Sequence, residues 1–175
     1  MSKTSLLREL RSMEKEQLVE IILQAYTSSK ETKEYFDFFV NPNPQQMYEK
    51  YSESITKEFS RTKRGHRTKA RISVIKSAIK KFMTFEPGNE LVTDLYLHAI
   101  NFALQTEKKV YFSETLFNGI KKLACDAVVY SDKHGTAKQL LNGVDRLLDT
   151  ETGTKYFRRI VKEGIADGLI KVSQS

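Results

Sequence analysis

The sequence has little of what several classes of protein require. Its 175 residues include one cysteine, three prolines, eight glycines and no tryptophan. One cysteine excludes a disulfide framework within the chain and a zinc site built from cysteines, and so few prolines and glycines argue against a many-turned β-sandwich or a low-complexity chain. The sequence begins without an apolar signal segment, and no apolar run approaches the ~18 residues that span a membrane. We therefore expect a soluble, cytoplasmic protein.

Basic residues are concentrated in one segment of a chain whose formal net charge is +7. Between Lys57 and Lys81, ten basic residues are opposed only by Glu58, so this segment carries +9 and the remainder of the chain carries −2. A surface of one sign attracts phosphate, anionic lipid or an acidic protein face within a Debye length of about 8–10 Å. The charge pattern thus indicates a local binding surface for a polyanion.

Apolar residues recur at intervals of three and four along most of the chain, and no segment shows the strict alternation of a half-buried strand. We predict an all-α fold with a single domain over residues 1–175 and about seven or eight helices in an irregular bundle; an α–α superhelix is the alternative. The segment Glu90 to Gln105 is apolar around most of its circumference, so this helix is expected at the centre. The last helix is expected over Thr154 to Asp167, with the apolar residues after Gly168 folding back on it.

The basic segment is predicted to form a helix over Arg67 to Phe85. Its apolar residues share one face, and the opposite face presents lysines and serines in one line that suits a run of phosphate oxygens. The line lacks the Asn, Gln or exposed aromatic side chains that read or stack bases. Acidic protein partners, membrane surfaces, and a solvated face neutralised by neighbouring acidic residues are the alternatives. We predict a non-enzymatic protein that binds nucleic acid without strong sequence preference through Arg61, Lys63, Arg64, Arg67, Lys69, Lys76 and Lys80.

Glu90, Asp94 and His98 share one face of the expected central helix. Carboxylate and imidazole groups at helical spacing can ligate a metal, but these three span about 12 Å of helix rise, which is too long for one ion. We expect lysines of the preceding helix, or Arg71, to neutralise the two carboxylates. No phosphate-binding glycine motif, zinc-protease motif or catalytic triad is recognisable. We therefore expect no metal, no cofactor and no enzymatic activity.

The segment Lys30 to Val40 is rich in aromatic residues, including Tyr35, Phe36 and Phe39. Burial in a core is the usual fate of such residues, and we expect it here. Exposed aromatics, however, form hot spots of protein interfaces. The alternative function is therefore a protein-interaction module or adaptor, which an exposed apolar patch around Phe36 or Phe39 would favour.

Four stretches carry a resemblance to a known family: Lys33–Phe39, Lys57–Phe59, Lys63–Gly65 and Lys69–Ser73. Together they resemble an uncharacterised bacterial family of small proteins that is known only as a domain of unknown function. The resemblance covers most of the chain. It implies a bacterial cytosolic protein, and it implies no activity, cofactor or functional residue.

Overall fold

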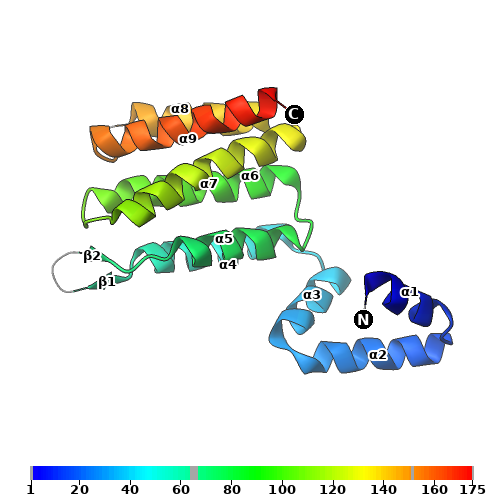
Figure 1. Ribbon diagram of the computed structural model, residues 1–175. Coiled ribbons are helices and arrows are strands. Elements are labelled where there is room, and N and C mark those ends of the chain that lie inside the picture. Colours follow the sequence, from blue (N-terminus) through cyan, green and yellow to red (C-terminus); the bar gives the residue numbers. More distant parts are fainter. Residues whose placement is uncertain (1, 64–66, 151, 175) are drawn as a thin grey trace. The chain divides into compact units, whose positions relative to one another are not determined.

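The computed structural model describes residues 2–63, 67–150 and 152–174, with the backbone but not the side chain of residue 63. Over these ranges it contains nine helices and one two-stranded antiparallel sheet (Figure 1). The predicted all-α class is confirmed, with one or two helices more than expected. None of the helices in these ranges combines the length and apolar character that a membrane crossing requires.

The chain divides into two compact units, Met1–Asn43 and Pro44–Ser175. The first unit contains α1 (Lys3–Arg11), α2 (Lys15–Ser28) and α3 (Lys30–Val40). The hydroxyl of Tyr26 donates a hydrogen bond to the carboxylate of Asp37 at 2.8 Å, which joins α2 to α3. No residue described in this unit is buried. That residues 1–175 form a single domain stays a prediction.

The second unit is built around α6. Eight residues of α6 are buried, and the helix contacts each of the other five helices of the unit. The central position predicted for this segment is therefore confirmed, as expected for a helix that is apolar almost all round. The elements of the unit are α4 (Pro44–Phe59), β1 (Thr62–Lys63), β2 (Arg67–Thr68), α5 (Ile72–Met83), α6 (Asn89–Glu107), α7 (Glu114–Lys133), α8 (Ala137–Asp149) and α9 (Lys155–Ser173).

Helices α7 and α9 approach closely at two glycines. A Cβ added at Gly164 would lie 2.3 Å from the backbone oxygen of Lys121, and one added at Gly168 would lie 2.6 Å from the Cβ of Val128. Only a residue without a side chain fits such a contact. The prediction that Gly168 ends the last helix is wrong: α9 continues to Ser173, because this glycine serves a helix contact and not a turn.

The prediction of a helix beginning at Arg67 is also wrong, because α5 begins at Ile72. Arg67 and Thr68 form β2, which pairs with β1. The backbone N–H of Thr68 also donates to the backbone oxygen of Tyr111 at 3.3 Å. Strands of two residues are too short to show an alternating pattern, so the sequence did not indicate them.

Three parts of the second unit lie at the same end of it, on the left in Figure 1: strands β1 and β2, the segment 108–113, and the start of α9. The hydrogen bond from Thr68 to Tyr111 joins the first two. The carboxylate of Glu107, at the end of α6, accepts hydrogen bonds from the backbone N–H and the hydroxyl of Thr154 at 3.0 and 2.9 Å. The fold thus brings together segments that are far apart in the sequence.

Candidate functional site

A buried carboxylate on α4 holds the two arginines that flank the sheet. Glu58 is 6% exposed. It accepts hydrogen bonds from the guanidinium of Arg61 at 3.0 and 3.1 Å, from the backbone N–H of Arg71 at 2.9 Å, and from the guanidinium of Arg71 at 3.0 and 3.3 Å. Burial alone would raise the pKa of Glu58, but these bonds outweigh burial and hold that pKa below its ordinary value of 4.5. The ionised carboxylate therefore fixes both ends of the segment that contains β1 and β2.

An exposed tyrosine lies beside β2 with an arginine over its ring. Tyr111 is 64% exposed, and the guanidinium carbon of Arg67 lies 5.6 Å from its ring centroid. A parallel β-bridge joins the backbones of these two residues. The attraction between cation and ring is favourable, and the backbone pairing fixes which residues meet. Ring and guanidinium thus form a flat, cationic surface next to solvent.

A second exposed tyrosine, at the start of α9, has the same kind of partner. Tyr156 is 52% exposed, and the guanidinium carbon of Arg159 lies 5.4 Å from its ring centroid. The ring of Tyr156 also packs edge-on against Phe117 at a centroid distance of 5.5 Å. Phe117 lines a surface pocket together with Tyr111. Both tyrosines therefore border the same aromatic cluster.

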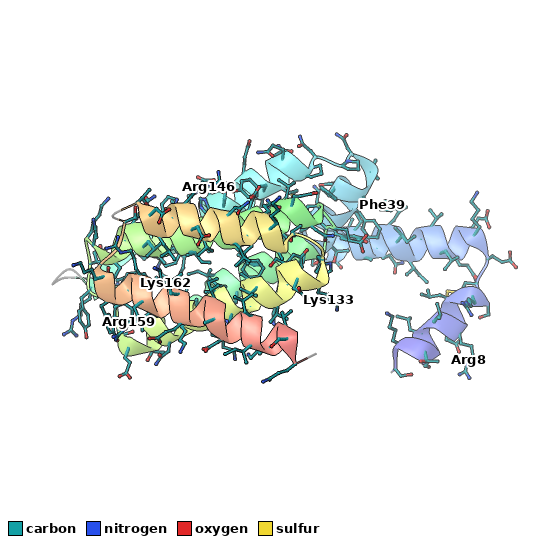
Figure 2. All side chains as sticks on the ribbon, turned by 90° about the horizontal axis from the view of Figure 1, so that it is seen from above. Arg8, Phe39, Lys133, Arg146, Arg159 and Lys162 are labelled. Carbon is teal, nitrogen blue, oxygen red and sulfur yellow. The ribbon has the colours of Figure 1, made fainter. Side chains whose placement is uncertain are left out.

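Basic residues lie close to these two tyrosines along the three segments that meet at this end. We define the basic end as Arg67, Lys69, Lys108, Lys109, Lys155, Arg158 and Arg159. Figure 2 shows Arg159 at this end of the second unit and Lys133 at the other. Among the described residues, the acidic side chains at this end include Glu107, which is engaged by Thr154, the exposed Glu114, and Asp149 at the end of α8. Arg159 also lies 3.6 Å from the carboxylate of Glu163. Positive charge therefore predominates at this end.

The structure brings together only part of the predicted nucleic-acid-binding set. Arg67 and Lys69 lie at the basic end, and the backbone N–H of Lys69 donates to the backbone oxygen of Arg61 at 2.7 Å. The guanidinium of Arg61 pairs with the buried carboxylate of Glu58 at 3.0 Å. The side chain of Lys63 and the whole of Arg64 lie outside the described residues.

The predicted line of lysines along one helix does not form. Lys69 precedes α5, so it cannot continue the face that Lys76 and Lys80 occupy. Lys76 forms an ion pair with Asp126 of α7 at 2.7 Å and is only 24% exposed. Lys80 is exposed about two turns into α5. Lys76 therefore fits the alternative of a helix face neutralised by neighbouring acidic residues better than it fits phosphate binding.

The polar residues of α6 are tied to their own neighbours. The side chain of Gln139 donates to Asp94 at 2.8 Å. The Nε2 atom of His98 lies 2.9 Å from the hydroxyl of Thr56 and 3.1 Å from the backbone oxygen of Ser52. Burial lowers the pKa of His98, although the contact with Ser52 acts against it. These contacts join α6 to α4 and α8.

The basic residues that were expected to neutralise Glu90 and Asp94 pair with other carboxylates. Lys76 pairs with Asp126 and Arg71 with Glu58, so the expectation is wrong for both. Within the part of the chain that the structure describes, no group of three His, Cys, Asp or Glu side chains is placed to hold a metal. That a metal and a cofactor are not needed stays a prediction.

The aromatic segment of the first unit is not a core. Phe39 is 70% exposed, and the neighbouring Val40 is 80% exposed. Leu23 on α2 is 59% exposed. Nine of the fourteen large apolar residues exposed in the described ranges belong to this unit. The expectation of core packing is therefore wrong for Phe39, which the 43 residues of its own unit do not enclose.

Sequence reasoning missed Tyr111, Tyr156 and Lys109. The run Lys108 to Tyr111 does contain a signal, since two lysines and a tyrosine follow the end of a helix. The sequence does not show that this run belongs to a site, because some forty residues separate it from β2 and a similar length separates it from α9. Only the tertiary structure places these segments at one end.

The comparisons with known proteins give one positive result. No curated protein and no solved structure matches the chain. A family model matches residues 1–168, which include all of the first unit and most of the second, and the family is described as a family of unknown function. The chain therefore belongs to the DUF6155 family of unknown function.

Proposed function

We propose that this protein is a non-enzymatic nucleic-acid-binding protein that contacts phosphates through the basic end, without strong sequence preference. The observation that carries the proposal is the gathering of basic side chains from three separate segments around two exposed tyrosines. Lysine and arginine contacts with phosphate supply most of the affinity of nonspecific nucleic-acid binding. They position the ligand but carry no sequence information.

Five side chains are the principal candidates for phosphate contacts: Arg67, Lys69, Lys109, Lys155 and Arg158. Within the described ranges none of these five forms an ion pair with a carboxylate, and Arg158 donates to the backbone oxygen of Thr150 at 3.4 Å. Their charges are therefore available to a ligand. Lys76 and Lys80 are left out, because Lys76 is paired and both lie on α5, away from the tyrosines.

The proposal is tested by fluorescence anisotropy with labelled DNA and RNA at low salt. The charge-reversed variant Lys69→Glu/Lys109→Glu is expected to bind much more weakly than the wild type. The matched control is Lys133→Glu/Lys138→Glu, which removes the same charge from the end of α7 and the start of α8 and is expected to retain affinity. No binding by the wild type at low salt would refute the proposal. An equal loss of affinity in both variants would show that the net charge of the protein, and not the basic end, determines binding.

A second candidate function rests on the exposed apolar residues of the first unit: self-association through α2 and α3. A segment of about forty residues seldom builds a sufficient core alone, and association is a common remedy. Light scattering of the full chain should then give at least a dimer, which Leu23→Ser/Phe39→Ser dissociates. The control Ile170→Ser removes an apolar residue of α9 whose exposure is close to that of Leu23. A monomer at all concentrations would contradict this function.

Two finer expectations accompany the proposal. We infer an irregular bundle for the second unit, because α6 contacts all five other helices, whereas in a superhelix each repeat contacts only its neighbours. The cytoplasmic location and the bacterial origin implied by the resemblance remain predictions.

A further inference from the structure

We propose that the basic end is selective for single-stranded nucleic acid over duplex, with Tyr111 and Tyr156 as stacking positions for unpaired bases. This inference rests on the proposed function and adds the class of ligand. Its physical basis is that single strands present the flat faces of their bases, whereas a duplex encloses those faces between neighbouring base pairs.

Tyr111 has the features that a stacking position needs. Its side chain is 64% exposed although it follows a segment that is fixed in the fold. The β-bridge to Arg67 and the hydrogen bond from Thr68 hold its backbone in place. With its backbone already fixed, the residue loses less conformational freedom when a base stacks on its ring than a residue of a mobile loop would. Arg67 lies over the ring, and its guanidinium plane offers a second surface on which a base can stack.

Tyr156 supports a second position on the same ligand. It is half exposed, carries Arg159 over its ring and packs edge-on against Phe117. Because Phe117 also lines the pocket beside Tyr111, the two tyrosines border one surface. Lys109 and Lys155 are close to these tyrosines in sequence, and Lys69 directly follows β2, whose Arg67 is bridged to Tyr111. The cationic groups that hold the sugar–phosphate chain therefore accompany the rings that hold the bases. This combination of aromatic platforms and cations is typical of single-strand binding.

The test uses the full chain and three labelled probes: a single-stranded RNA, a single-stranded DNA, and the duplex formed by the same DNA strand. Anisotropy at one salt concentration should give about tenfold tighter binding of the single strands than of the duplex. Tyr111→Ala should weaken single-strand binding by about tenfold and should weaken duplex binding much less. Tyr111→Phe keeps the ring and should retain the affinity of the wild type.

A second measurement uses the absence of tryptophan. The intrinsic fluorescence then comes from tyrosine, and stacking on a base should quench part of it in the wild type and less in Tyr111→Ala. Duplex bound as tightly as single strands, or an unchanged affinity of Tyr111→Ala for single strands, would overturn this inference while the proposed function stands. If none of the probes binds at low salt, the proposed function itself fails. Because Tyr111 is exposed, the wild type, Tyr111→Ala and Tyr111→Phe should have the same midpoint of thermal unfolding by circular dichroism.

Discussion

Replacing Gly164 by alanine tests the close contact between α7 and α9 on which the second unit depends. The new Cβ would lie 2.3 Å from the backbone oxygen of Lys121, about 1 Å closer than ordinary contact, and 3.0 Å from the Cβ of Ala124. Neither atom can rotate away, so the helices must separate. Overpacking of this kind costs about 1–3 kcal/mol or more, while alanine itself favours a helix interior by about 1 kcal/mol over glycine. Because the nearest atom belongs to the backbone, the cost lies at the upper end of this range, and the free energy of unfolding should fall by about 2 kcal/mol net.

Gly143→Ala is the matched control, since this glycine also lies inside a helix and also contacts another helix. Its Cβ would meet the Cδ1 atom of Leu97 at 2.5 Å, and this atom is the far end of a flexible side chain that can move. The higher helix propensity of alanine then offsets most of the cost of moving the Leu97 side chain, and the free energy of unfolding should change by less than about 1 kcal/mol. Urea unfolding followed by far-ultraviolet circular dichroism measures both variants. Gly164→Ala as stable as Gly143→Ala would refute the reasoning.

Three further predictions concern charged and titratable groups. Glu58→Gln removes the charge that both arginines bind and should lower the free energy of unfolding by about 1–2 kcal/mol. The loss stays this small because the two arginines are partly exposed and regain hydrogen bonds with water. In the wild type the contribution of Glu58 is complete above pH 4.5 and is lost as the pH falls through its lower folded-state pKa, so the stability of Glu58→Gln should depend less on pH in the acid range. The ring of His98 should titrate below pH 6.5 by nuclear magnetic resonance, and stability should decline as the pH falls through that midpoint; a midpoint at or above 6.5 would contradict the burial argument. Lys76→Gln/Lys80→Gln should leave nucleic-acid affinity unchanged, and a large loss by anisotropy would restore the helix-face hypothesis.

The sequence predicted those features that depend on local pattern. The interval of three and four between apolar residues identified the helices, and the apolar circumference of α6 identified the central one. Gly135 and Gly153 follow the ends of α7 and α8 and lie at turns, where both have φ values near +75°. Gly168 has the same local appearance but lies inside α9. A glycine at a turn and one at a helix contact differ only in their tertiary neighbours.

The candidate site was predicted in its charge but not in its arrangement. The basic segment is real, yet Glu58 holds Arg61 and Arg71, and Asp126 neutralises Lys76. Partners far along the chain decide such pairings, and helical spacing does not reveal them. Tyr111 was missed for the same reason, because its pairing with Arg67 crosses two helices of intervening sequence.

The salt dependence of binding tests the central claim most directly. If the five principal basic side chains each contact a phosphate of duplex DNA, the logarithm of the association constant should fall with the logarithm of salt concentration with a slope of about −4.5. Lys69→Gln/Lys109→Gln removes two of these contacts, so its slope should be shallower by about 1.8. Lys133→Gln/Lys138→Gln loses the same charge at the other end of the unit and should keep the slope of the wild type. Identical slopes for the two variants, or affinity that does not depend on salt, would contradict the account.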